Sequence, residues 1–213
     1  MGFSMKRPAI ARGMWVGLGL LWLAAVGVGF ALLTRHSLTP GATHEAPAQW
    51  PQAAHPPRAE GRPTLVMLAH PRCPCTRASL GELAVVMEHA RGQLDARVLF
   101  LRPEGTSGDW TQGPLWRAAA GIPGVRVLAD EGGTQARLFG AVTSGHSLLY
   151  DAQGRLRFSG GLTVARGHRG DNPGRDAVEA LLREAGGSGG TSQHAVYGCA
   201  LEEPPEVRAT NTP

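Results

Sequence analysis

The sequence predicts an α/β domain, a central mixed sheet flanked by helices, carried on one N-terminal transmembrane helix. Two observations predict the domain. Short apolar runs typical of strands alternate with helix-like segments from residue 64 to residue 140, and such alternation favours parallel strands with helices on both faces. Two further strand-like runs are joined by Asp151-Ala-Gln-Gly154, a turn sequence that predicts a hairpin adding an antiparallel edge.

The first elements are predicted by apolar spacing. Thr64 to Ala69 is a continuous apolar run typical of a buried strand. From Leu80 the apolar residues recur at helical spacing, and Gly92 suits the position just past the end of that helix. Residues 96–101 are expected to form the second strand.

The later elements are predicted by their boundaries as much as by their interiors. Pro114 is tolerated in the first turn of a short helix over 111–120. Asn172 as cap and Pro173 at the first helical position begin a last helix, which ends at Gly186. Between them we expect strands over 125–129, 147–150 and 156–159 and a helical patch over 135–139.

The N-terminal region predicts a membrane anchor. Residues 13–34 carry no charge, and about 20 apolar residues suffice to cross a bilayer as a helix. Lys6, Arg7 and Arg12 precede this run, against Arg35 after it, which places the N-terminus in the cytoplasm. We therefore expect a single-pass protein of the cytoplasmic (inner) membrane with its soluble domain facing the periplasm; the alternative is a cleaved signal peptide.

Composition divides the chain into five parts. We expect a cytoplasmic N-terminus over 1–12, a transmembrane anchor over 13–34, a flexible linker rich in proline and alanine over 35–62, a folded domain over 63–185, and a Gly/Ser spacer with a cysteine-containing tail over 186–213. The net charge of +4 is spread along the chain without a basic block, so nucleic acid is not expected as a partner.

Two cysteines stand at the junction between the first strand and its helix. The N–H groups at a helix N-terminus favour thiolate over thiol, so Cys73 and Cys75 form a candidate reactive dithiol. His70, Arg72 and Arg77 are expected to act in the same direction through their charge.

These features resemble a known family. The strand leading into Cys73-Pro-Cys75, the segment Ala136-Arg-Leu-Phe-Gly-Ala141 and the hairpin from Ser147 are similar to the thioredoxin-like superfamily, specifically to membrane-tethered TlpA/ResA-like (RedB-like) proteins. The resemblance implies a thioredoxin-like fold and thiol–disulfide exchange with another thiol protein, without a cofactor. It leaves open which cysteine attacks first.

The chain departs from the family pattern in two places. The family motif is Cys-x-x-Cys, whereas this chain has Cys73-Pro-Cys75. The family also places a cis-proline before the hairpin strand, where this chain has Thr143-Ser-Gly145-His146. The second departure puts ordinary thioredoxin-type substrate docking in doubt.

An alternative hypothesis is copper binding. Two thiolates and an imidazole suit Cu(I), and Cys73, Cys75 and His146 are similar to the cysteine pair and distant histidine of Sco-type copper chaperones. The wider cysteine spacing of those proteins makes the parallel loose. His146 is otherwise a polar residue of a pocket.

Two later segments supply further candidates. Arg166 and His168 lie in a long glycine-rich loop, from which they are expected either to lower the pKa of the dithiol or to bind an anionic group, unless the loop is a plain turn. Cys199 follows the Gly/Ser spacer. If the tail folds back over the dithiol, Cys199 becomes a resolving thiol or a third sulfur ligand; otherwise it is an incidental cysteine of a disordered tail.

Overall fold

The computed structural model describes residues 9–90, 92–184 and 190–202. It divides into two units, residues 1–37 and residues 38–213. The expected cytoplasmic segment 1–12 and the expected Gly/Ser spacer lie largely outside the described residues, so both stay predictions.

The first unit is a single helix, α1 (Ala9–Leu38). Its apolar part, Gly13–Leu38, is 26 residues long and therefore long enough to cross a bilayer. A signal sequence near an N-terminus also meets this criterion of length and composition.

The second unit is built on a six-stranded mixed sheet with the order β3-β2-β1-β4-β5-β6. Its strands are β1 (Thr64–Ala69), β2 (Asp95–Arg102), β3 (Val125–Glu131), β4 (His146–Tyr150), β5 (Leu156–Gly160) and β6 (Ser192–Gln193). Strands β1, β2 and β3 are parallel, and β4 is antiparallel to both β1 and β5. The predicted hairpin is therefore real, but it is not the edge: β6, which was not predicted, pairs with β5 beyond it.

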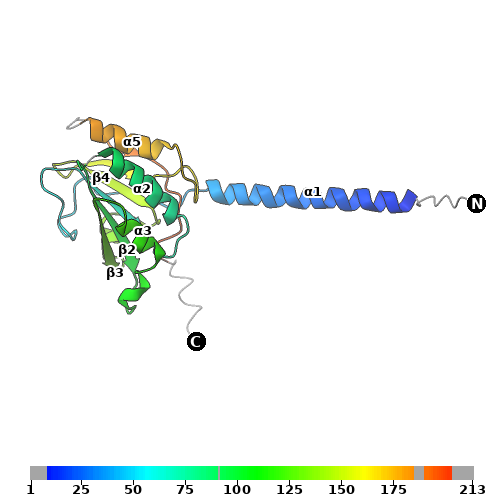
Figure 1. The fold of residues 1–213 in the computed structure, drawn as a ribbon, viewed down its shortest axis with the longest axis horizontal. Helices are drawn as coiled ribbons and strands as arrows, with labels where there is room; N and C mark the ends of the chain where they lie inside the picture. The colour runs from blue at the N-terminus through cyan, green and yellow to red at the C-terminus, as the bar shows by residue number, and fades with distance from the viewer. Residues whose placement is uncertain (1–8, 91, 185–189, 203–213) are drawn as a thin grey trace, which may run out of the picture. The chain divides into compact units, whose positions relative to one another are not determined.

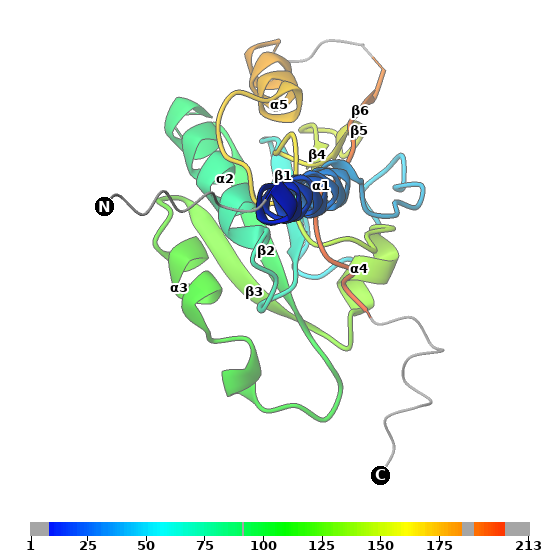
Figure 2. The ribbon, with the colours of Figure 1, turned by 90° about the vertical axis from the view of Figure 1, so that its right-hand side faces the viewer.

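Helices cover both faces of the sheet. They are α2 (Thr76–Ala90), α3 (Pro114–Ala120), α4 (Thr134–Leu138) and α5 (Pro173–Arg183), with a 3-10 turn, η1 (Gly108–Trp110), before α3. Helices α2, α3 and α5 lie on one side of the sheet and α4 on the other (Figures 1 and 2). Because side chains alternate along β1, Leu65 and Met67 enter the core beneath α2 while Val66 and Leu68 enter the second core with Phe139.

The segment expected to be a flexible linker, 35–62, has a different structure. Helix α1 continues to Leu38, and much of the rest packs against the domain. The ring of Trp50 lies edge-on to Phe139 and Tyr150, with centroids 5.1 and 5.3 Å away. The backbone N–H of Trp50 donates to the Gly154 carbonyl at 2.8 Å. Its polar composition predicted disorder, but one aromatic side chain and backbone pairing to the hairpin anchor it.

The described part of the tail, residues 190–202, also packs against the domain. Val196 and Leu201 are buried, at 1% and 3% exposure. The N–H of Gly41 donates to the carbonyl of Val196 at 2.8 Å, which joins the start of the second unit to the tail. The domain thus extends beyond the expected limits of 63–185 on both sides.

Candidate active site

The dithiol lies in the turn that joins β1 to α2. Within this turn the Cys73 N–H donates to the His70 carbonyl at 3.2 Å, and the Thr76 N–H donates to the Cys73 carbonyl at 3.1 Å. Cys73 is buried, at 2% exposure, whereas Cys75 is partly exposed. The helix begins at Thr76, directly after Cys75, so its first N–H groups lie next to the sulfurs.

The loop before β4 is tied to this turn through Ser144. The Ser144 hydroxyl accepts a hydrogen bond from the His70 N–H at 2.8 Å and lies 2.8 Å from the Thr76 hydroxyl. The next residue, Gly145, donates its N–H to the Leu68 carbonyl at 2.8 Å. Sequence reasoning did not select Ser144, although it had singled out Thr143-Ser-Gly145-His146 as the segment before the hairpin strand.

The tail pairs with the same loop as a short antiparallel strand. The Ser144 N–H donates to the Cys199 carbonyl at 2.8 Å, and the Leu201 N–H donates to the Val142 carbonyl at 2.9 Å. Thr143 and Ala200 form the antiparallel bridge between them. This pairing delivers Cys199 to the dithiol, with its Sγ 2.9 Å from the Sγ of Cys73.

The three sulfurs form one cluster and lie within 4.8 Å of one another. Burial opposes ionisation of Cys73, but its pKa is lowered because Cys199 donates both its thiol and its backbone N–H to the Cys73 sulfur. The N–H groups of Thr76 and Cys75, at the start of α2, add two further hydrogen bonds.

The other two thiols respond in the opposite direction. Burial, and then the negative charge of Cys73, raise the pKa of Cys75. Burial and the hydrogen bond to Cys73 raise the pKa of Cys199 to about 12. The cluster therefore favours a single thiolate, on Cys73, with two protonated thiols beside it.

The basic residues of the turn are placed differently from the sequence expectation. The Arg72 guanidinium lies over the ring of Trp110, 4.8 Å from its centroid, and His70 lies edge-on to the same ring at 5.5 Å. Burial and the charge of Arg72 lower the pKa of His70, which favours its neutral form. Arg77 is exposed on α2. Hydrogen-bond donors rather than these charges lower the pKa of Cys73.

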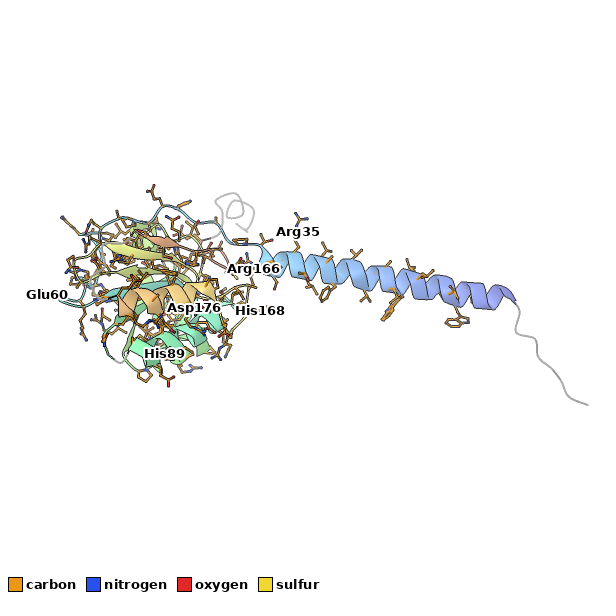
Figure 3. All side chains as sticks on the ribbon, turned by 90° about the horizontal axis from the view of Figure 1, so that it is seen from above. Arg35, Glu60, His89, Arg166, His168 and Asp176 are labelled. Carbon is orange, nitrogen blue, oxygen red and sulfur yellow. The ribbon has the colours of Figure 1, made fainter. Side chains whose placement is uncertain are left out.

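The glycine-rich loop brings Arg166 to the site but leaves His168 at the surface. Arg166 donates from Nη1 to the Gly198 carbonyl, next to Cys199, and its charge favours ionisation of Cys75 and Cys199 against the stronger effects that raise their pKa values. His168 is exposed. Both residues lie at the end of the domain opposite Glu60 (Figure 3).

A buried carboxylate holds this loop against the helix that follows the dithiol. Glu82 of α2, with its side chain 2% exposed, accepts a hydrogen bond from the Gly170 N–H at 2.8 Å and forms an ion pair with Arg175 at 2.7 Å. Asn172 donates to the same carboxylate at 3.3 Å and, as predicted, caps α5. The loop is therefore ordered by contacts that its own composition did not reveal.

His146 does not join the sulfur cluster. It is 1% exposed at the start of β4, and its Nε2 lies 2.9 Å from the Ser159 hydroxyl. Its Nδ1 is buried without a hydrogen-bond partner among the described residues. Burial lowers the pKa of His146 to about 4, so the imidazole is neutral at ordinary pH. Among the described residues, the structure thus groups Cys73 and Cys75 with Cys199 rather than with His146.

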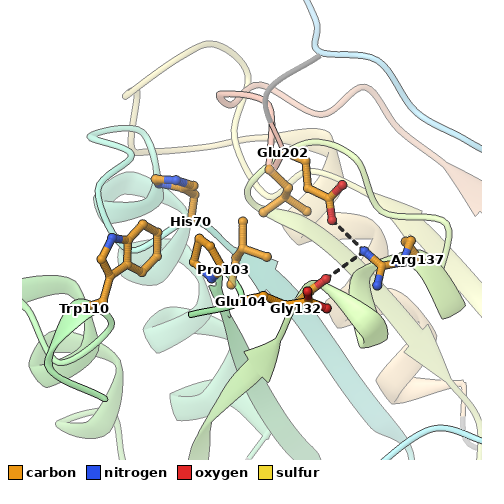
Figure 4. Close-up of a pocket in the computed structure, with 9 residues that line it drawn as sticks. His70, Pro103, Glu104, Trp110, Gly132, Arg137 and Glu202 are labelled. Atoms are coloured by element: carbon orange, nitrogen blue, oxygen red, sulfur yellow. Dashed lines mark hydrogen bonds and ion pairs between the residues drawn. The ribbon is translucent and has the colours of Figure 1, made fainter. Parts of the chain in front are cut away.

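A cavity of about 460 Å³ adjoins the site. His70 and Trp110 line one side of it, and Leu201 and Glu202 of the tail line another. Glu202 forms an ion pair with Arg137 at 2.8 Å, so the wall formed by the tail is tied to α4 (Figure 4). The cavity thus lies between the dithiol turn and the tail.

The strand order and the dithiol at the end of the central strand define a thioredoxin-like domain. Two solved structures share the fold over most of their length. One is a hypothetical protein from Sinorhizobium meliloti, with a TM-score of 0.52 and 21% identity over 79% of this chain and 97% of that one. The other is an uncharacterized conserved protein from Geobacillus kaustophilus, with a TM-score of 0.54 and 15% identity over 79% and 94%.

A more distant structural match is copper-bound ScoI from Bradyrhizobium japonicum, with a TM-score of 0.43 and 16% identity over 59% of this chain and 86% of that one. No family model and no curated protein matches the sequence. The predicted fold class is confirmed.

Proposed function

We propose that this protein is a membrane-anchored, extracytoplasmic thiol–disulfide oxidoreductase in which Cys73 attacks first. The observation that carries the proposal is the position of Cys73, whose sulfur lies 2.9 Å from that of Cys199 and beside the start of α2. The pKa of Cys73 is lowered, while those of Cys75 and Cys199 are raised. Because the thiolate is the nucleophile in disulfide exchange, the cluster supports one attacking sulfur with protonated thiols available to complete the reaction.

The reaction proceeds in two exchanges. The Cys73 thiolate attacks a disulfide of a partner protein, forming a bond from Cys73 to one partner sulfur while the other leaves as a thiolate and takes up a proton. A second thiol of the cluster then loses its proton and attacks the Cys73 sulfur, which releases the second partner thiol. The partner disulfide is reduced to two thiols, and two thiols of this protein become a disulfide.

Cys199 is the better placed resolving thiol. Its sulfur is 2.9 Å from that of Cys73. Cys73 and Cys75 are separated by a single residue, a spacing at which the Cα separation and torsion of a disulfide are hard to satisfy. We therefore assign Cys199 as the resolving residue. Cys75 is a neighbouring thiol that stays protonated while Cys73 carries the negative charge.

The test maps disulfides in the full chain, purified reduced and anaerobically in detergent micelles. The protein is equilibrated with glutathione buffers of graded potential, quenched by alkylation and analysed by mass spectrometry. We expect a reversible Cys73–Cys199 disulfide with a defined midpoint, retained in Cys75→Ala and lost in Cys73→Ser. The absence of any reversible disulfide involving Cys73 would overturn the proposal.

The second candidate function is Cu(I) binding, which the three-sulfur cluster favours. Sulfurs within 4.8 Å of one another are a soft donor set that fits Cu(I), with Cys73, Cys75 and Cys199 as the ligands. Equimolar Cu(I) would then protect all three thiols from alkylation in the wild type and in His146→Ala, but not in Cys199→Ala. Protection that instead depends on His146 would indicate the Sco-like ligand set, and no protection would exclude both.

A further inference from the structure

The tail pairs with residues 142–144 in the way that a bound peptide pairs with the edge of a sheet. Two backbone hydrogen bonds hold it, from Ser144 N–H to the Cys199 carbonyl and from the Leu201 N–H to the Val142 carbonyl, at 2.8 and 2.9 Å. Main-chain pairing of this kind gives affinity for any extended peptide, and pockets for alternate side chains give selectivity.

Ser144 joins this edge to both the tail and the dithiol turn. Its N–H donates to the Cys199 carbonyl at 2.8 Å, and its hydroxyl accepts from the His70 N–H at 2.8 Å. We call residues 142–144 the docking edge, which therefore lies next to the reactive sulfur.

The environment of the tail defines what the edge accepts. A Cβ on Gly198 would overlap the Ser144 carbonyl oxygen, so only glycine fits immediately before the cysteine. Leu201, two residues after the cysteine, is 3% exposed and packs in the core beside Phe139. Ala200 between them is exposed and therefore unrestricted.

The tail also covers the attacking sulfur. Cys73 is 2% exposed, and the sulfur of Cys199 lies 2.9 Å from its own. A partner sulfur that approaches Cys73 along this edge would occupy the position of the Cys199 sulfur. The tail and the partner therefore compete for the same edge.

We propose that residues 142–144 bind the partner as an extended segment of the pattern Gly-Cys-x-apolar, and that Gly198–Leu201 is a tethered mimic of that segment which must leave before the partner docks. This inference rests on the proposed function. In the step it concerns, the Cys73 thiolate forms a bond to the cysteine sulfur of the segment, and the sulfur previously bound to that cysteine leaves as a thiolate.

The test compares two full-length variants in detergent micelles that have the same thiols. Cys199→Ala keeps the backbone pairing of the tail, and the double variant Gly198→Val/Cys199→Ala disrupts it. The probes are the peptide Val-Tyr-Gly-Cys-Ala-Leu and its Val-Tyr-Val-Cys-Ala-Leu counterpart, each linked through its cysteine to thionitrobenzoate. Release of coloured thionitrobenzoate gives the rate, and mass spectrometry locates the mixed disulfide at Cys73.

We expect the glycine peptide to react about tenfold faster with the double variant than with Cys199→Ala, because two backbone hydrogen bonds of the tail no longer compete. The valine peptide should gain much less. Leu201→Asp/Cys199→Ala, which weakens tail docking without a change near Ser144, should repeat the result if Gly198→Val disturbs the fold.

The remaining outcomes separate the two proposals. An equal gain for both peptides means that the tail merely shields Cys73, and no gain means that it does not compete; either result overturns the docking edge. If Cys73 still reacts with the small disulfide dithiobis(nitrobenzoate) in those cases, the proposed oxidoreductase function survives. If Cys73 reacts with none of the disulfides in any variant, both proposals fail.

Discussion

The Sγ atoms of Cys73 and Cys199 lie 2.9 Å apart although 126 positions separate them in the chain. The thiol of Cys199 acts as the donor that stabilises the Cys73 thiolate. The contact that lowers the pKa of Cys73 while the tail is docked thus involves the same residue that we propose resolves the mixed disulfide.

Removing the Cys199 thiol should raise the pKa of Cys73. In Cys199→Ala the Cys73 sulfur loses one hydrogen bond that stabilises its thiolate, so we expect its pKa to rise. The rate of Cys73 alkylation by iodoacetamide as a function of pH, with the product located by mass spectrometry, measures it. Cys75→Ala is the matched control: it removes a thiol whose charge would compete, so it should not raise the pKa. An unchanged profile in Cys199→Ala would refute the assigned donor.

Burial of His146 should make the domain less stable in mild acid. Because its pKa is lowered from 6.5 to about 4, the unfolded chain takes up a proton between these values while the folded chain does not. The free energy of unfolding therefore has its full value above pH 6.5. As the pH falls toward 4, about 3 kcal/mol of it is lost. Urea unfolding of the full chain in micelles measures this loss, with the unfolded fraction determined from the susceptibility of the domain to proteolysis.

The variant His146→Gln isolates this contribution. Glutamine does not titrate, so the difference in unfolding free energy between wild type and variant should shrink as the pH is lowered from 7 to 4.5. A difference that stays constant over this range would show that His146 titrates normally.

Loss of the Glu82 charge should loosen the loop that carries Arg166. Glu82→Gln leaves the cation of Arg175 against a neutral group at a site 14% exposed or less, and breaking a buried ion pair costs about 3 kcal/mol. Asp171→Asn is the control, since Asp171 pairs with the same arginine from a fully exposed position. We expect lower unfolding free energy for the first and no measurable change for the second; equal effects would contradict the assignment.

Trp50 should hold the segment between α1 and the sheet. In Trp50→Ala the two edge-on contacts with Phe139 and Tyr150 are lost, and we expect destabilisation of about 2–3 kcal/mol. Limited proteolysis should then cleave within 39–62 much faster. Gln52→Ala, at an exposed position of the same segment, should leave the cleavage rate unchanged. A rate in Trp50→Ala equal to that of the wild type would show that Trp50 does not hold the segment.

Local patterns along the chain were sufficient to predict most of the fold. The continuous apolar run 64–69 coincides with β1, and Asn172 caps α5 as predicted. Apolar periodicity and caps are properties of a few neighbouring residues, so they can be recognised without knowledge of the rest of the chain. The position of Cys73 and Cys75 between strand and helix follows from the same signals.

Contacts between distant segments determined what local patterns left open. The two residues of β6 are too few for a periodic pattern, and the start of the second unit and the tail have a composition typical of disorder. Whether Cys199 meets Cys73 depends on pairing of residues 199–201 with 142–144, whose hydrogen bonds are made by the backbone and are therefore not encoded in side-chain spacing. The exclusion of His146 from the cluster has the same origin, because strand register placed its ring beside Ser159 rather than beside the sulfurs.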